Sequence, residues 1–249
     1  MRARLFLRVC YDAPALDCRR VLRILPWPAH VAADETVAVS PLPTFQSESR
    51  DRFGNRVLHL RHTRIEREFS LSLDGQYPAV STASPTKGGT AGAWKLPSRA
   101  VAFSPELLSL ARDFRSLPAV ERAEKLNQLV FESLEYTSEL NSHPLNATTI
   151  WIQKCGTCAD FAHVLLALGR AAGLPSRYVA GFGPAPGALH AWVEFGFEGY
   201  WYAFDPTHGR RAEGLYLPVA KGRDFYDCSP HRGYFHGGNA RLAMHCELA

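Results

Sequence analysis

Short stretches of alternating apolar and polar residues run from residue 4 to about residue 80, broken by Pro, Asp and Gly. Alternation with a period of two is typical of strands that bury one face, so these stretches predict a small antiparallel β domain. The turn at Asp51–Asn55 is predicted from its Gly and Asn, which adopt the positive φ that a tight reversal needs. The expected strands are Leu5–Val9, Val21–Leu25, Thr36–Val39, Val57–Leu60 and Phe69–Leu73.

The periodicity is lost over residues 81–99, which contain Ser-Pro, Lys-Gly-Gly-Thr and Leu-Pro-Ser. Such a composition is typical of a linker. We therefore expect an N-terminal β domain over residues 1–82, a linker over 83–100 and a second domain over 101–249.

Beyond the linker, apolar residues recur every three or four positions, which predicts amphipathic helices. The first has Ser104 as a good N-cap and Pro105 at its first position, and is expected to end near Ser116. A second helix is expected from the recurrence between Ala123 and Leu134.

The third helix is the most clearly delimited. Thr157-Cys158-Ala159-Asp160 predicts a capping box at its start, and Gly173 followed by Pro175 predicts its end. Cys158 is therefore expected in the first turn of a helix.

Strands are expected again after Pro175. They are Arg177–Ala180, Ala191–Phe195, Trp201–Phe204, Leu215–Val219 and Ala240–Leu248. The order of a β region, a helical section and a sheet with little helix predicts an α+β domain behind an N-terminal antiparallel β domain.

Composition narrows the classes of protein that fit. The chain has 249 residues, 46% apolar and 21% charged, as in an ordinary globular protein. Its net charge of +4 is scattered, so no nucleic-acid partner is expected. The apolar stretch near the N-terminus is too short for a signal peptide and no run approaches a membrane span, so we expect a cytoplasmic protein with no membrane partner. The six cysteines do not form a dense framework, and reduced thiols are expected.

Cys158 is the first residue that suggests chemistry. A thiol is a nucleophile only as the thiolate, and a helix N-terminus favours that anion through unpaired N–H groups and the positive end of its dipole. The same N–H groups can face the oxyanion that forms when sulfur attacks a carbonyl. A cysteine at a helix start can also be simply a small buried hydrophobe, so its assignment depends on its partners.

His190 and Asp205 are the expected partners. A thiolate mechanism needs an imidazole to exchange the proton and a carboxylate to orient that imidazole. The two residues lie on adjacent predicted strands. A four-residue loop over 196–199 would place them directly opposite each other, and a two-residue loop of Glu198-Gly199 would place them on one face, one diagonal step apart. A three-residue loop would separate them.

The other nine histidines are expected to be structural. His59 and His62 lie in the N-terminal domain, and His231 and His236 lie in a Gly-rich region that predicts a loop. His163 lies about a turn and a half into the third helix, where packing or capping is favoured over catalysis.

Four segments carry a pattern in a characteristic order, namely Cys155–His163, Gly173–Gly181, His190–Glu194 and Phe204–Thr207. They strongly resemble the bacterial transglutaminase-like superfamily. In addition, Asp51–Val57 resembles the β region that precedes this domain in bacteria, and Gly222–Pro230 resembles its C-terminal strand segment. The resemblance covers nearly the whole chain.

The resemblance implies a papain-like α+β core with Cys158 as nucleophile, His190 as general base and acid, and Asp205 as the orienting carboxylate. Family members pass the acyl group either to an amine, as transglutaminases, or to water, as peptidases and amidases, and the bacterial branch is generally peptidase-like. The metal-binding loops of the animal cross-linking enzymes have no visible counterpart here, so neither a metal nor a cofactor is expected. We expect hydrolysis of a peptide or protein substrate, with amine transfer as the alternative; the oligomeric state is not predicted.

Cys155 departs from the family pattern and creates a C-x-x-C with Cys158. A dithiol redox site is therefore an alternative, although residues 146–154 do not predict the strand that a thioredoxin-like unit needs. A zinc site lacks a second close ligand pair. A nonenzymatic binding module is a third alternative, disfavoured because all three triad groups are present. Reversible disulfide formation by Cys155 is a hypothesis for modulating the nucleophile.

The surroundings of the site are less defined by sequence. Gln153, Trp151 and Tyr136 are all candidates for a side-chain oxyanion donor beside the Cys158 amide. Residues 182–189, rich in Gly and Pro just before His190, are expected to form a rim or lid.

Overall fold

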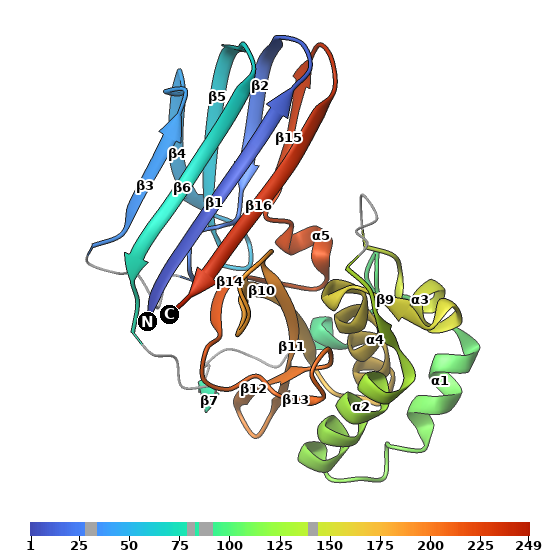
Figure 1. Ribbon diagram of the computed structural model, residues 1–249. Coiled ribbons are helices and arrows are strands. Elements are labelled where there is room, and N and C mark those ends of the chain that lie inside the picture. Colours follow the sequence, from blue (N-terminus) through green and yellow to red (C-terminus); the bar gives the residue numbers. More distant parts are fainter. Residues whose placement is uncertain (28–33, 79–82, 85–91, 139–143) are drawn as a thin grey trace.

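The strand β1 (Arg2–Tyr11) buries every second side chain, as its alternating sequence predicts. It lies inside one of two four-stranded antiparallel sheets that enclose an apolar core. The computed structural model describes residues 1–27, 34–78, 83–84, 92–138 and 144–249. Figure 1 shows the two sheets as a sandwich beside the helical part of the molecule.

The remaining strands of the sandwich come from both ends of the chain. They are β2 (Ala15–Leu22), β3 (Thr36–Ser40), β4 (Phe45–Arg50), β5 (Arg56–Ile65), β6 (Glu68–Gln76), β15 (His231–His236) and β16 (Ala240–Leu248). One sheet has the order β16-β1-β6-β3 and the other the order β15-β2-β5-β4. The predicted N-terminal antiparallel β region is therefore present.

The last two strands correct the expected domain division. β16 pairs with β1 along its length and β15 pairs with β2, so residues 231–248 complete the sandwich instead of extending the second domain. The N- and C-termini consequently lie side by side (Figure 1). His231 and His236, expected in a loop, begin and end β15. Sequence periodicity identifies strands but not their partners, which is why the boundary at 101–249 failed at its C-terminal end.

A third sheet and a layer of helices form the rest of the molecule. The helices are α1 (Pro105–Arg112), α2 (Ala119–Ser133), α3 (Ala147–Gln153), α4 (Cys158–Ala171) and α5 (Phe225–Cys228). The strands are β10 (Ser176–Phe182), β11 (His190–Phe197), β12 (Tyr200–Asp205), β13 (Arg210–Arg211) and β14 (Leu217–Gly222), in the order β13-β12-β11-β10-β14. α4 packs on β10 and β11 and is itself surrounded by α1, α2 and α3. Among the described residues, no helix is long and apolar enough to cross a membrane.

Four further elements, each of two or four residues, belong to the described part of the fold. β7 (Ala83–Ser84) lies in the expected linker but pairs with β12, and a 3-10 helix, η2 (Gly92–Lys95), follows it. The strands β8 (Glu135–Tyr136) and β9 (Cys155–Gly156) pair in parallel just before α4. Residues 85–91 of the expected linker lie outside the described residues.

Side-chain caps mark where α1 and α3 begin. The Ser104 side chain accepts from the Leu107 N–H at 3.2 Å, as expected for the first helix, although α1 ends earlier than predicted. Asn146 caps α3, a helix that the sequence did not predict, by accepting from the Thr149 N–H at 3.0 Å.

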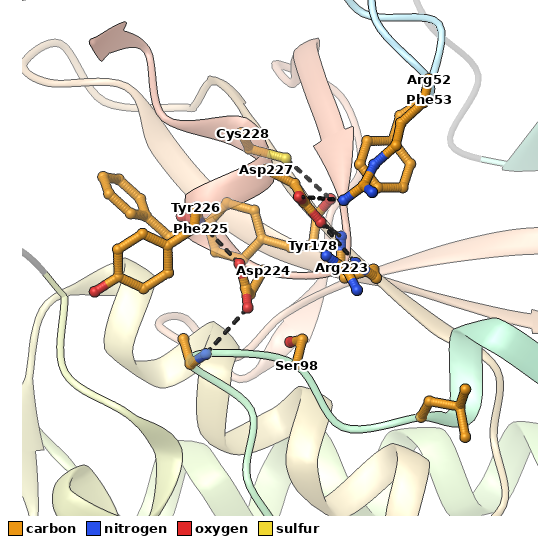
Figure 2. Close-up of polar contacts among 12 residues, drawn as sticks. Arg52, Phe53, Ser98, Tyr178, Arg223, Asp224, Phe225, Tyr226, Asp227 and Cys228 are labelled. Atoms are coloured by element: carbon orange, nitrogen blue, oxygen red, sulfur yellow. Dashed lines mark hydrogen bonds and ion pairs between the residues drawn. The ribbon is translucent and has the colours of Figure 1, made fainter. Parts of the chain in front are cut away.

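The segments Asp51–Val57 and Gly222–Pro230 meet where the sandwich joins the third sheet, as Figure 2 shows for Arg52 and Asp227. Arg52 donates to Asp227 at 3.0 Å, and Arg223 donates its Nε to the same carboxylate at 2.9 Å. Asp224 accepts from the Ala100 N–H at 3.0 Å and caps α5. The segment 222–230, expected to be a strand, thus contains a helical turn that ties the two parts together.

Candidate active site

Cys158 is the first residue of α4, and the predicted capping box is confirmed. The Asp160 carboxylate accepts from the Thr157 N–H at 2.9 Å and from the Thr157 hydroxyl at 2.8 Å. The second Asp160 oxygen accepts from the Leu145 N–H at 2.9 Å. These contacts fix the first turn of α4 and hold the partly buried Cys158 at the positive end of the helix dipole.

Gly156 makes this arrangement possible. A Cβ at this position would lie 2.6 Å from the Cβ of Asp160, which is closer than two non-bonded carbon atoms can approach. A side chain at residue 156 would therefore displace the carboxylate that caps α4. The Gly-x-Cys spacing has a packing reason, independent of the chemistry.

His190 opens β11 and Asp205 ends the neighbouring β12. The strands pair Phe197 with Tyr200, so the hairpin loop is the two residues between them, and the second of the predicted registers is correct. Asp205 therefore lies one diagonal step from His190 on the same face. His190 Nε2 lies 2.7 Å from Asp205 Oδ2, and the Cys158 side chain interacts with the same imidazole.

The electrostatics of the pair favour an ionised site. Burial by itself lowers the pKa of His190, but hydrogen bonds to Asp205 and Cys158 outweigh it and raise that pKa to about 10. Burial likewise opposes ionisation of Asp205, whose side chain is fully buried, yet its donors lower its pKa far below the usual range. An imidazolium and a carboxylate therefore face each other at neutral pH.

A pocket of about 510 Å³ opens onto Cys158 and His190. Its wall includes residues 183–189, which agrees with the expected rim. Gly187 in this rim exchanges two backbone hydrogen bonds with Cys246 of β16, at 2.9 and 2.6 Å. The last strand of the sandwich thus holds the rim of the pocket in place.

Two site residues escaped the sequence interpretation. His208 Nδ1 and the Tyr216 hydroxyl each lie 2.7 Å from Asp205 Oδ2. His208 lies three residues after Asp205, within the Asp-Pro-Thr-His sequence, and this proximity to a recognised motif was a signal that could have identified it. Tyr216 carried no comparable signal, because its approach depends on the path of the chain after β13.

His190, Asp205 and His208 also form a group whose donor atoms lie within 4.8 Å of one another. Such a group invites comparison with a metal site. However, both imidazoles place a nitrogen at hydrogen-bonding distance from one carboxylate oxygen, and hydrogen bonding accounts for this arrangement. The zinc site considered from the sequence used Cys155 and Cys158, and neither belongs to the group.

The candidates for the side-chain oxyanion donor separate clearly. Tyr136 lines the pocket together with Cys158. The Trp151 indole N–H instead donates to Glu106 at 2.9 Å, and Gln153 is exposed outside the pocket wall. Cys155 is exposed on β9, and both thiols of the C-x-x-C are free.

His163 is structural, as predicted. It is fully buried, its Nδ1 lies 3.0 Å from the Leu145 carbonyl, and its Nε2 accepts from the Phe225 N–H at 3.2 Å. Burial lowers the pKa of this imidazole, so the neutral ring bridges α4 to the first residue of α5.

Comparison with known proteins identifies a family model that matches the part of the chain containing this site. Residues 109–206, which contain Cys158, His190 and Asp205, match the family model of the transglutaminase-like superfamily. The chain thus contains a transglutaminase-like core. Its transglutaminase-like core is the predicted α+β fold, formed by the helices and the third sheet.

Solved and sequenced relatives extend the likeness to the sandwich. A crystal structure from Cytophaga hutchinsonii, described as that of a candidate cysteine protease, superimposes on 100% of this transglutaminase-like chain and 90% of its own, with a TM-score of 0.78 and 25% identity. An uncharacterized protein of Mycobacterium tuberculosis is 28% identical, over 79% of this chain and 74% of its own length. One from Mycobacterium leprae is 30% identical over 53% of this chain and 49% of its own.

Proposed function

We propose that this protein is a cysteine hydrolase that cleaves peptide-like amides through Cys158, His190 and Asp205. The observation that carries the proposal is that His190 hydrogen-bonds to Asp205 and lines one pocket with Cys158, whose side chain interacts with the same imidazole. The match of residues 109–206 to the transglutaminase-like superfamily model supports acyl transfer from an amide. The likeness to a candidate cysteine protease favours water as the acceptor.

In the first half-reaction, the Cys158 thiolate attacks the amide carbon and the carbonyl oxygen takes the negative charge. His190 then gives its Nδ1 proton to the leaving nitrogen, because Nε2 is held by Asp205. The carbon–nitrogen bond breaks, an amine leaves and a thioester to Cys158 remains. Asp205 keeps the ring oriented throughout.

In the second half-reaction, the neutral His190 accepts a proton from water through Nδ1 while the water oxygen attacks the thioester. The carbon–sulfur bond breaks, an acid leaves, and the thiolate and imidazolium are restored. An amine entering in place of water would complete a transglutaminase reaction with the same groups. The acceptor is therefore the point on which the two candidate reactions differ.

The oxyanion would be stabilised at the start of α4. N–H groups in the first turn of a helix have no acceptor within the helix, and the Cys158 N–H belongs to that turn. Tyr136 supplies the side-chain donor in this proposal, since its phenol lines the pocket and burial, followed by the charge of Cys158, raises its pKa. A raised pKa keeps the hydroxyl protonated and able to donate.

The activation of Cys158 can be tested without knowing the substrate. We expect replacement His190→Ala to slow alkylation of Cys158 by iodoacetamide at pH 7 by about tenfold, because the thiolate loses its counter-ion. Site-resolved mass spectrometry measures the rate. Cys10 is exposed and serves as the reference thiol in each sample, and His236→Ala, which alters an exposed histidine on β15, is the matched control. Equal labelling of Cys158 in wild type and His190→Ala would refute the triad.

Hydrolysis and amine transfer are separated by following a peptide thioester or anilide with and without added amine. We expect the free acid as the main product even at millimolar amine. A product that partitions mainly to the amine would replace hydrolysis by the transglutaminase reaction. Redox cycling of the C-x-x-C, with all activity lost in Cys155→Ser, would favour the dithiol alternative instead.

A further inference from the structure

Asp205 accepts more hydrogen bonds than a triad carboxylate needs. Its Oδ1 accepts from the backbone N–H of Thr207 at 2.9 Å and of His208 at 3.3 Å. Its Oδ2 is shared by His190 Nε2, His208 Nδ1 and the Tyr216 hydroxyl, each at 2.7 Å. The carboxylate is fully buried, so these donors replace water as its solvation.

His208 stands out among the donors because only part of it is buried. Its side chain is 42% exposed and lines the same pocket as Cys158, while its Nδ1 reaches the buried oxygen. Its ring centroid lies 5.4 Å from that of His190. Since a carboxylate can only accept, the Nδ1 of His208 must carry the proton in this contact.

The imidazoles of His190 and His208 therefore hydrogen-bond to the same oxygen atom, Oδ2 of Asp205. The negative charge of Asp205 retains the proton of the His190 imidazolium, and each further donor to Oδ2 delocalises part of that charge. We propose that His208 is a positioning residue, which orients the Asp205 carboxylate and limits how strongly it holds the His190 imidazolium. This proposal rests on the proposed function, because it concerns the same triad.

Several titratable or charged groups from the surrounding elements face His190 and Asp205, and they contribute to any pH titration of this site. Among the described residues, Cys158 approaches from α4, and Tyr216 approaches from the segment before β14. The positive charge of Arg210 of β13 acts on Tyr216, and Tyr136 lines the pocket from β8. All of these side chains are present in wild type and in every His208 variant, so a difference between the variants originates at His208.

The test follows the His190 ring directly by NMR of its Cε1–H as a function of pH, alongside the pH dependence of Cys158 alkylation. In His208→Ala we expect the titration of His190 to move to higher pH by about one unit, because Asp205 loses a competing donor. His208→Asn should return it close to the wild-type value, since the Asn amide occupies the place of Nδ1 and keeps an N–H donor. His236→Ala should leave the titration unchanged.

His208→Gln keeps a polar side chain but moves its donor away from the Nδ1 position, so it should behave like His208→Ala and provides a second variant should the first fold poorly. A His190 titration that coincides with wild type in both variants, with only a lower melting temperature, would overturn the proposal. That outcome is distinct from failure of the proposed function, which is decided by Cys158 alkylation in His190→Ala. A titration that moves to lower pH would equally overturn it.

Discussion

Asp205 shows how a single buried side chain organises the candidate site. Its carboxylate receives donors from β11, from the turn after β12 and from Tyr216, and all of them compensate for the loss of water. Removing any one donor is expected to affect the others, because they share the same charge. The site is therefore a coupled group and not a set of independent contacts.

The pKa of His190 leads to a prediction about stability. A histidine whose pKa is about 10 in the folded protein and near 6.5 when unfolded stabilises the fold fully below pH 6.5, and this stabilisation is lost as the pH rises toward 10. We expect the free energy of unfolding of wild type to fall more steeply than that of His190→Gln between pH 7 and 10, by up to about 1.4 kcal/mol per pH unit. Urea unfolding at several pH values measures both slopes. Parallel curves would contradict the charged state of His190.

The histidines also show the limit of single-residue interpretation. The buried position of His163 was predictable from its place on an apolar helix, and the structure confirms it. His208 was assigned a structural role because a turn residue has no periodic pattern that reveals its direction. Its contact with Asp205 is set by the backbone of residues 205–208, which the carboxylate itself stabilises through two N–H groups.

At the scale of elements, the β11–β12 hairpin decided between interpretations that the sequence had left open. Glu198 and Gly199 both have positive φ, at 54° and 80°, which matches a two-residue turn. The sequence allowed this turn and the four-residue loop equally, because Gly occurs at both ends of residues 196–199. Both loops keep His190 and Asp205 on one face, so the proximity of these two residues was predictable although the register was not.

The packing of α4 on β11 supplies a prediction at this scale. A Cβ at Gly169 would lie 2.2 Å from Cε1 of the buried Phe195 ring, so the helix approaches the strand closely here. We expect Gly169→Ala to lower the free energy of unfolding by about 1–3 kcal/mol, because overpacking outweighs the gain in helix propensity. Chemical denaturation measures the change.

Gly92→Ala is the matched control, since a Cβ there meets nothing within 4 Å, and it should change stability by less than about 0.5 kcal/mol. Adding Phe195→Leu to Gly169→Ala should recover part of the loss, because the two sites are in contact. If Gly169→Ala were as stable as wild type, the close approach of α4 to β11 would be wrong.

At the scale of the whole molecule, the sandwich and the transglutaminase-like core are joined at several points. β15 and β16 return to the sandwich after the core is complete, and β16 holds the pocket rim through Gly187. The Asp227 carboxylate links Arg52 of the sandwich to the core (Figure 2). The sandwich is therefore a structural support of the pocket as well as a separate layer.

Asn55 provides the sharpest test of this junction. It is fully buried, and its amide donates to the Lys221 carbonyl at 2.9 Å and accepts from the Lys221 N–H at 2.7 Å, which satisfies the edge of strand β14. We expect Asn55→Ala to cost about 2–4 kcal/mol of unfolding free energy, since it leaves both backbone groups unpaired. Denaturant unfolding of the intact chain measures the loss.

Arg52→Ala is the control on the same turn. The Arg52 side chain is 66% exposed, so loss of its ion pair with Asp227 should cost less than about 1 kcal/mol. Equal losses for both variants would mean that general disturbance of the turn, and not the Asn55 hydrogen bonds, stabilises the junction.

The sequence alone determined the local features of this protein. The capped start of α4, the alternating strands of the sandwich and the common face of His190 and Asp205 follow from short-range periodicity and capping, which act over a few residues. Gly54 indeed takes positive φ in the predicted turn. Tertiary structure alone decided the pairing of β15 and β16 with β1 and β2, the contact of Asn55 with Lys221 and the convergence of His208 and Tyr216 on Asp205. These contacts depend on burial and hydrogen-bond satisfaction between segments that are brought together only by the complete fold, so no local pattern encodes them.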